Sequence, residues 1–523
     1  MHQKRIVVVG AGIGGLAAAV QLAAEGCGVT VVEKSGGPSG KMRQVEAGGA
    51  LIDAGPTVFT MREVFDSLFE KAGASLDDYL TLRPAQVLAR HAWKTGGELD
   101  LFADIDATAD AIGAFAGKDE ARGYLTFCNE AANIYRILDR SFIRAQKPTP
   151  PALMARIGLL NVSDLWRINP RQSFWSFVCY YMRDPRLRQL FARYTTYCGA
   201  SPFSAPATLA LIAHVEHRGV WLVDGGMVRL AEALESLARR LGVAFRYEAH
   251  AEEVLTSNGQ ASGIKLVTGE QVDADAVVLN ADVSAASAGL LGLAAKNAAS
   301  KLPARKRSMS ALTWAFRAEA AEGFPLARHT VFFPDAAYDL EFDAIFKQRK
   351  LPPSPAVYLC AQDRDDRGGL RSQGSERFLA IVNAPAILDA HALSQSEIEE
   401  CERRTFRLMA ACGLTLKPMD GAMVRRSPQD FEKLYPGTGG AIYGRAPHGW
   451  MASFQRQGIR SRLPGLYFAG GSVHPGPGVP MAALSGQLAS QALLEDLAST
   501  KRFHRMATPG GMSMRSAPTT ASD

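Results

Sequence analysis

The feature that most constrains the fold is a glycine-rich turn near the start of the chain. Residues 6–9 (IVVV) form a β-branched run typical of a buried strand, and Gly10, Gly12 and Gly15 follow it as G-x-G-x-x-G. Gly10 permits a tight turn, Gly12 lets the backbone approach a pyrophosphate, and Gly15 lets the next helix pack closely on the strand. The pattern predicts a strand, turn and helix that bind phosphates at the helix N-terminus.

A second strand and an acidic residue complete this unit. Residues 29–32 are again apolar and β-branched, and Glu33 follows them directly. A carboxylate in this position accepts a hydrogen bond from a ribose 2′-hydroxyl, whereas an NADP site must accommodate a 2′-phosphate. The stretch therefore predicts a nucleotide site and argues against NADP.

The composition limits the class of fold and of partner. With 523 residues, 47% of them hydrophobic, the chain can bury the cores of two or three domains. A net charge of +6 suits an anionic membrane surface or a polyanionic cofactor, and no Lys/Arg block is dense enough to indicate nucleic acid. Seven scattered cysteines without a C-x-x-C pair indicate neither disulfides nor a metal site, so a reducing cytoplasm is expected. No run of 18 apolar residues predicts a membrane-spanning helix, and no secretory signal is expected, because the first apolar run carries the nucleotide motif.

Further segments of nucleotide-binding type lie far apart in the sequence. A second glycine loop covers 36–41, and DAGPT follows at 53–57. Alternating strands over 241–280 predict a meander that returns to the first sheet, and another buried strand is predicted at 465–469.

This spacing predicts a discontinuous α/β domain with inserted segments. We assign the nucleotide domain to 1–75, 215–300 and 421–498. The insertions 76–214 and 301–420 would form an α+β domain for substrate and membrane, and the tail 499–523 is expected to be disordered.

The segment before the last helix indicates the cofactor. Gly470 to Pro480 is a glycine- and proline-rich loop, and it leads into a helix expected to begin at Pro480 or Met481. The N-terminus of that helix would stabilise the negative charge that a reduced flavin carries near N1 and the C2 carbonyl. A purely NAD-binding fold needs no such second loop. The sequence therefore predicts FAD, with AMP and pyrophosphate on the first unit and the ring against this loop.

Several motifs together resemble the bacterial carotenoid desaturases of the phytoene-desaturase family. They are GAGIGGL, VVEK, GGPSGK, DAGPT, WLVDGGMVRLAEAL, GGAIYGR and FAGGSVHPGPGVPMAALSG, and the resemblance runs from Ile6 to about Leu497. Within the family, SVHPGPGVPMA and GGAIYGRAPHG are most similar to the branch that desaturates hydroxyneurosporene or methoxyneurosporene.

The resemblance implies a GR2-type Rossmann-like FAD fold and a set of cofactor contacts. The set is Gly10, Gly12, Gly15, Glu33, Lys34, Gly40, Lys41, Gly55, Pro56, Thr57, Val254 beside the adenine, Asn280, Asp282, Gly470, Gly471, Val479, Pro480 and Met481. The chain departs from many flavin oxidoreductases at two positions, where Lys41 replaces an arginine and Ser472 an acid. Desaturases commonly lack that acid.

The resemblance also implies 3,4-desaturation of an acyclic 1-hydroxy or 1-methoxy C40 carotenoid. A C–H bond beside a polyene is not acidic, so hydride loss to flavin N5 comes first and a weak base then takes the neighbouring proton. Asp224, Glu216, His217 and His474 lie in family-like segments, but none is assigned as a catalytic residue. The electron acceptor, oxygen or a quinone, stays open.

Two segments bear on how a lipophilic substrate enters. Aromatic stretches over 174–182 and 191–206 are candidates for lining a tunnel, although core packing is the commoner explanation for any single ring. Residues 141–168 combine apolar and basic side chains, which suits an interfacial helix at the inner face of the membrane as well as a helix docked on its own core.

Three other functions compete with this interpretation. A phytoene desaturase or carotenoid isomerase is the nearest. An amine oxidase would need an aromatic cage and often a cysteine bonded to the flavin, and no cysteine lies within 470–480. A flavin-free lipid-binding escort similar to the inhibitors of small GTPases would not need the second glycine loop.

Overall fold

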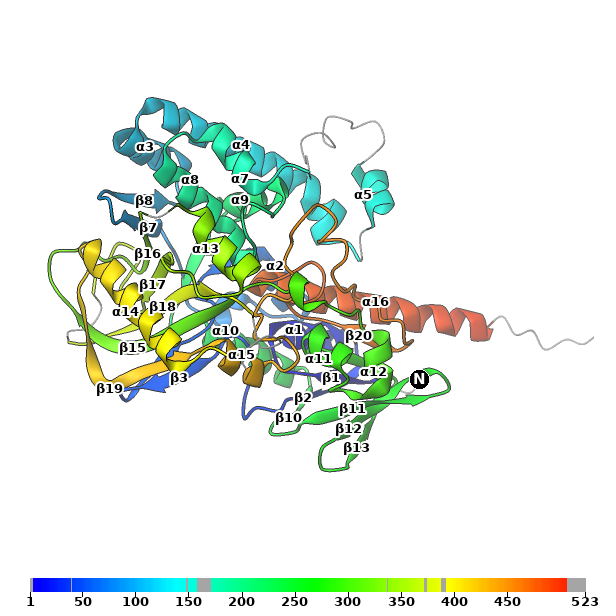
Figure 1. The fold of residues 1–523 in the computed structure, drawn as a ribbon. Helices are drawn as coiled ribbons and strands as arrows, with labels where there is room; N and C mark the ends of the chain where they lie inside the picture. The colour runs from blue at the N-terminus through cyan, green and yellow to red at the C-terminus, as the bar shows by residue number, and fades with distance from the viewer. Residues whose placement is uncertain are drawn as a thin grey trace, which may run out of the picture.

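The computed structural model describes residues 3–505 except 39, 147–148, 158–170, 336, 371–373 and 387–391, and it describes only the backbone of 500–505. Figure 1 shows a nucleotide-binding layer at the bottom, a second sheet at the side and a layer of helices above. Segments far apart in the sequence meet in each layer.

A five-stranded parallel sheet forms the nucleotide-binding layer. Its spatial order is β10 (Ala244–Arg246), β2 (Gly28–Val32), β1 (Arg5–Val9), β14 (Ala276–Leu279) and β20 (Leu466–Phe468). The central strands are apolar and buried on both faces, as parallel strands covered by other elements must be. The predicted strands at 6–9, 29–32 and 465–469 are confirmed, and so is the discontinuous Rossmann-like fold.

Four helices pack together beside this sheet. α1 (Ile13–Ala24) contacts α10 (Val228–Arg240) and α16 (Val479–Arg505), and α2 (Arg62–Lys71) contacts both α1 and α16. α1 and α16 approach most closely at Gly14 and Gly486, where a Cβ on Gly486 would overlap the Gly14 carbonyl oxygen. The last helix is therefore held directly against the first.

The predicted meander is correct only in part. β11 (Ala251–Ser257), β12 (Gln260–Leu266) and β13 (Gln271–Asp273) form a separate antiparallel sheet, while β10 and β14 join the parallel one. α11 (Val283–Ala288) and α12 (Gly292–Ala298) follow, and α12 packs against β11.

A seven-stranded mixed sheet lies beside the nucleotide layer. Its order is β19 (Leu416–Arg426), β15 (Ser310–Ala320), β18 (Glu376–Ala384), β17 (Val357–Ala361), β16 (His329–Phe333), β7 (Val87–Trp93) and β8 (Glu98–Phe102). β16 pairs with β7 in parallel, which joins segments more than 200 residues apart. α14 (Gln395–Ala411) packs against β16 and β17.

A layer of helices covers the other side of this sheet (Figure 1). It contains α3 (Ile105–Ala116), α4 (Lys118–Leu138), α7 (Phe174–Tyr181), α8 (Pro185–Ala192) and α9 (Leu211–His217), with the 3-10 helices η3 (Arg193–Cys198) and η4 (Ala207–Ala210). α5 (Pro150–Ile157) stands apart at the edge of the layer. The remaining helices are η1 (Leu76–Asp78), η2 (Asp139–Ile143), η5 (Ala304–Lys306), α13 (Asp339–Asp343), η6 (Ala344–Gln348) and α15 (Pro428–Leu434).

Small sheets connect the layers, and two strands lie at or across the predicted boundaries, which stay a prediction. β3 (Gln44–Ala47) pairs with β4 (Ala50–Asp53), and β9 (Val220–Val223) lies between β5 (Phe59–Thr60) and β6 (Leu82–Pro84). β6 falls in the predicted insertion 76–214 but pairs with a strand of the nucleotide segment. β19 crosses the boundary placed between 420 and 421. Backbone pairing of β6 with β9 therefore links the predicted insertion to the nucleotide segment.

The structure describes part of the segment predicted to contact a membrane and part of the predicted C-terminal tail. α16 continues to Arg505, past the predicted start of the tail at 499, and 506–523 lie outside the described residues. The predicted amphipathic segment 141–168 is described except for 147–148 and 158–168, and it contains the end of η2 and α5. Within the described ranges, no helix is long and apolar enough to cross a membrane.

Candidate active site

The nucleotide turn closes around a single asparagine side chain. An ideal Cβ on Gly12 would lie 2.7 Å from Asn280 Oδ1, and Cβ atoms on Gly14 and Gly470 would each lie 2.8 Å from Asn280 Nδ2. The Asn280 backbone N–H donates to the Val9 carbonyl at 2.8 Å, which holds the residue at the end of β1. The glycine positions are therefore required by internal packing as well as by any approaching phosphate.

Glu33 anchors the turn from the end of β2. Its Oε2 accepts a hydrogen bond from the Ala11 N–H at 2.8 Å, and its Oε1 accepts one from the Ser35 N–H at 2.9 Å. The side chain is buried but still lines the cavity described below. Because an ionised carboxylate offers about four acceptor positions, Glu33 retains capacity for ribose hydroxyls.

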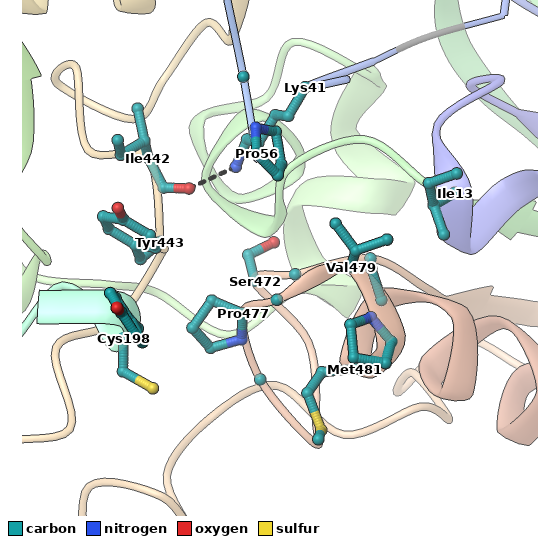
Figure 2. A pocket seen from close by; sticks show the side chains of 18 of the residues that line it. Ile13, Lys41, Pro56, Cys198, Ile442, Tyr443, Ser472, Pro477, Val479 and Met481 are labelled. Atoms are coloured by element: carbon teal, nitrogen blue, oxygen red, sulfur yellow. Dashed lines mark hydrogen bonds between the residues drawn. The ribbon is translucent and has the colours of Figure 1, made fainter. Parts of the chain in front are cut away.

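Lys41 joins the second glycine loop to the GGAIYGR segment. Its Nζ donates to the Ile442 carbonyl at 2.6 Å, the dashed bond in Figure 2. Burial lowers the pKa of Lys41; attraction to Asp282 opposes this shift and repulsion from Arg456 adds to it. Lys41 thus brings a buried amine to the place where Pro56 and the C-terminal loop meet.

Arg456, which the sequence analysis missed, fastens the two C-terminal loops to each other. Its guanidinium is buried and donates to the carbonyls of Tyr443 at 3.2 Å, Gly471 at 3.1 Å and Arg445 at 2.7 Å. Burial lowers the pKa of Arg456 to about 10, so it stays charged at neutral pH. Its partners belong to GGAIYGR and to the loop after β20, so Arg456 joins the two motifs in the fold.

The N-terminus of α16 lies in the same part of the site as Lys41 and Pro56. The helix begins at Val479, slightly earlier than predicted, and Pro480 occupies its first turn, where an N–H has no helical partner. In Figure 2, Lys41 and Pro56 approach from one side, and Ser472, Pro477 and Val479 approach from the other.

These groups line a cavity of about 1010 Å³. All but two of the predicted cofactor contacts are among its lining residues: Gly10, Gly12, Glu33, Lys34, Gly40, Lys41, Gly55, Pro56, Thr57, Asn280, Asp282, Gly470, Gly471, Val479, Pro480 and Met481. The same cavity continues into the helical layer, where Leu138, Leu190 and Ile212 line it. One space therefore joins the nucleotide turn to an apolar extension.

Gly15 and Val254 are the two predicted contacts that do not line the cavity. A Cβ on Gly15 would overlap the Gly10 carbonyl oxygen, so this glycine serves the close packing of α1 on β1. The side chain of Val254 is buried and the residue pairs with Ile264, so its place beside the adenine stays a prediction. Ala251, at the start of β11, lines the cavity instead.

Of the four residues considered as bases, Glu216 alone lines the cavity. Burial raises the pKa of Glu216 to about 7, and hydrogen bonds from Tyr194 and Tyr197 oppose that rise. His217 bonds to Tyr124, His474 bonds to the Phe142 carbonyl, and Asp224 pairs with Arg83.

Polar groups from separate segments extend the site beyond the sequence prediction. Tyr358 OH lies 2.5 Å from Thr57 Oγ1 and 2.7 Å from His329 Nδ1, and all three residues line the cavity. Arg193 and Tyr197 of η3 line it as well. They belong to the 191–206 stretch proposed as tunnel lining, whereas none of 174–182 reaches the cavity.

Comparison with known proteins decides the family. The model of flavin-containing amine oxidoreductases matches residues 13–494. A hydroxyneurosporene desaturase of Rubrivivax gelatinosus is 52% identical, with 99% of this chain and 98% of that protein aligned. The chain belongs to the flavin-containing amine oxidoreductase family, in its carotenoid desaturase branch. A zeta-carotene-forming phytoene desaturase of Myxococcus xanthus is 31% identical, with 94% of each chain aligned. A putrescine oxidase variant shares the fold, with a TM-score of 0.59 at 15% identity, over 95% of this chain and 99% of that one.

The residues of this carotenoid desaturase-branch protein fit FAD, and the chain is an FAD-dependent oxidoreductase. The glycine turn offers backbone at the start of α1, Glu33 keeps free acceptor positions, and the N-terminus of α16 lines the same cavity as Lys41. A helix N-terminus suits the anionic end of a reduced flavin.

One feature that bears on the amine oxidase alternative, a cysteine in the cavity wall, is visible only in the structure. Cys198 lines the cavity together with Tyr443 and Pro477 (Figure 2), although no cysteine lies near that loop in the sequence. Burial raises the pKa of Cys198 to about 11, which keeps it a thiol at neutral pH. A thiol is a poor nucleophile, so a covalent bond to the flavin is disfavoured.

Proposed function

We propose that this enzyme introduces one carbon–carbon double bond into an acyclic C40 carotenoid, by 3,4-desaturation of a substrate with a hydroxyl or methoxy group at C1. The observation that carries the proposal is the continuity of the cavity, which leads from the flavin cradle into an apolar extension lined by Leu138, Leu190 and Ile212. The names of the 52% and 31% identical relatives support a carotenoid as the substrate.

When bound, FAD supplies a two-electron acceptor for the hydride that leaves the carotenoid. The chain's own residues hold the polyene alongside the loop from Gly470 to Met481 and keep water away from it. Because the polyene spreads positive charge, the second step needs only a weak proton acceptor. Glu216 suits that role, since a carboxyl group with a pKa of about 7 is partly ionised at neutral pH.

The cavity has an opening that suits uptake from a membrane, and we include peripheral association with the inner face in the proposal. Met154 of α5 and Trp450 both line the cavity and are 45% and 44% exposed. Apolar side chains exposed at a cavity mouth, with Arg156 nearby on α5, suit an anionic bilayer surface. The electron acceptor would then be oxygen or a quinone.

The test uses the FAD-loaded protein in liposomes with hydroxyneurosporene, neurosporene and phytoene, followed by pigment analysis. We expect a red-shifted product with one more conjugated double bond, formed fastest from hydroxyneurosporene. Faster conversion of phytoene would favour the phytoene-desaturase alternative. Conversion of none of the three, with FAD bound and an acceptor supplied, would refute carotenoid desaturation.

A further inference from the structure

Arg193 brings a positive charge to the wall of the cavity. Its guanidinium lies over the rings of Tyr197 and Tyr358, at 5.6 Å and 5.4 Å from their centroids, and Nη1 donates to Tyr197 OH at 3.5 Å. Among the residues that the structure describes, Nε and Nη2 have no hydrogen-bond partner, and neither atom is sealed off by packing. Because Arg193 lines the cavity, these donors face it.

Two carboxyl groups, those of Glu341 and Glu216, are attracted by the charge of Arg193, and both already have hydrogen-bond partners. Glu341 accepts hydrogen bonds from the Ala356 N–H at 3.1 Å and from Asn383 Nδ2 at 2.8 Å. Glu216 interacts with the hydroxyls of Tyr194 and Tyr197. In the described part of the chain, neither carboxylate forms an ion pair with Arg193. Attraction to Arg193 acts to lower the pKa of both carboxyl groups, but the half-buried guanidinium keeps two donors without an acceptor among the described residues, and these are available to a ligand oxygen.

The position of Arg193 matches where that oxygen must lie. In a 1-hydroxy or 1-methoxy carotenoid, one carbon separates C1 from C3, so the C1 oxygen sits beside the bond that is oxidised and not at a distant tunnel end. Arg193 is connected to the flavin cradle through two of its neighbours. Tyr358, over which it stacks, bonds to Thr57, and Cys198 at the end of the same η3 lies by Pro477 (Figure 2).

We propose that Arg193 donates a hydrogen bond to the C1 oxygen of the substrate and so selects carotenoids with an oxygenated end group. This inference rests on the proposed desaturation. A guanidinium can only donate, and hydroxyl and ether oxygens both accept, so Arg193 serves 1-hydroxy and 1-methoxy substrates alike. A carboxylate such as Glu216 would accept from the hydroxyl alone. A pocket whose buried donor has lost its acceptor rejects the analogue without oxygen.

The test compares the FAD-loaded wild type with Arg193→Met and with Arg193→Lys. Arg183→Met is the matched control, since this exposed arginine lies in the turn before α8, outside the cavity lining. For each protein, kcat/KM and the dissociation constant, from quenching of tryptophan fluorescence, are measured with hydroxyneurosporene, its 1-methoxy derivative and neurosporene. Flavin content is read from the visible absorbance.

We expect Arg193→Met to weaken binding and kcat/KM for both oxygenated substrates by roughly 10- to 100-fold, the range for a hydrogen bond to a charged group. Neurosporene should bind Arg193→Met at least as well as the wild type, because the variant has no unpaired donor to bury, and Arg193→Lys should recover part of the loss on the oxygenated substrates. Equal losses on all three polyenes, or no loss on the oxygenated two, would overturn the inference. If the wild type converts none of the substrates, the proposed desaturation is refuted. The role of Arg193 is still tested in that case, because the dissociation constants are measured without turnover.

Discussion

At the scale of single residues, the side chain of Asn280 sets what the nucleotide turn tolerates. Its amide fills the space between Gly12, Gly14 and Gly470, which come from both ends of the chain. The glycine pattern could be predicted from sequence because it is local. Asn280 could be predicted only through the family resemblance, whereas Arg456 and Arg193 lie in segments that meet the site only in the fold, and no local spacing indicates those meetings.

Substitution of Gly12 tests this packing. Gly12→Val would force Asn280 or the turn to move, because even a Cβ would lie 2.7 Å from Asn280 Oδ1. We expect loss of bound FAD, measured as flavin absorbance per protein after reconstitution. Gly37→Ala is the control, because a Cβ there meets nothing within 4 Å. Full flavin occupancy in Gly12→Val would contradict the role given to the turn.

As pH increases, ionisation of Glu216 should lower the stability of the protein and raise its activity. The folded protein raises the pKa of Glu216 from 4.5 to about 7, so the native state holds a proton that the unfolded chain has lost between these values. Stability contributed by the protonated form is present below pH 4.5 and falls as pH rises to about 7, by at most about 3 kcal/mol. Desaturation that needs the ionised form rises over the upper part of this range.

Glu216→Gln removes both trends. Between pH 4.5 and about 7, we expect the melting temperature of the variant to decline less than that of the wild type. The rate of desaturation should fall roughly 100-fold, the lower bound for general-base catalysis. Thermal unfolding and pigment analysis at pH 5, 6, 7 and 8 provide the measurements. A variant with the wild-type rate and pH profile would exclude Glu216 as the proton acceptor.

At the scale of elements, the site depends on how α16 lies against α1. The sequence predicted the β1–α1–β2 unit and the β20–loop–α16 unit, because each shows apolar strands followed by a glycine turn. It did not predict the seven-stranded sheet. The parallel pairing of β16 with β7 depends on contacts between segments more than 200 residues apart, which local periodicity does not encode.

The contact between Gly486 and Gly14 tests the dependence on α16. Gly486→Leu would place a side chain against the backbone of α1 and move the N-terminus of α16 away from the cavity. We expect a loss of at least about 1–3 kcal/mol in unfolding free energy and weaker FAD binding. Gln491→Leu, at an exposed position of α16, serves as the control. Unchanged flavin binding in a destabilised Gly486→Leu would show that the helix position matters for stability alone.

At the scale of the whole molecule, the cavity reaches the surface where Met154 and Trp450 are exposed, and a bilayer in contact with this mouth could deliver a carotenoid directly. We expect Met154→Glu and Trp450→Glu to reduce flotation with anionic liposomes. The control Leu340→Glu changes a residue that is 50% exposed but does not line the cavity. Binding of the wild type should weaken above roughly 0.1 M salt, where the screening length is about 10 Å. Equal flotation of all variants would remove this surface as the contact.

The central claim is that the carotenoid passes its electrons to the flavin held in this cavity. The most direct measurement is a single turnover without oxygen or quinone, in which the FAD-loaded protein meets one equivalent of hydroxyneurosporene and both visible spectra are recorded. The account predicts that oxidised flavin absorbance is lost in a one-to-one ratio with formation of the product that has one more double bond. Product formation with the flavin still oxidised, or a flavin reduced without any product, would contradict it.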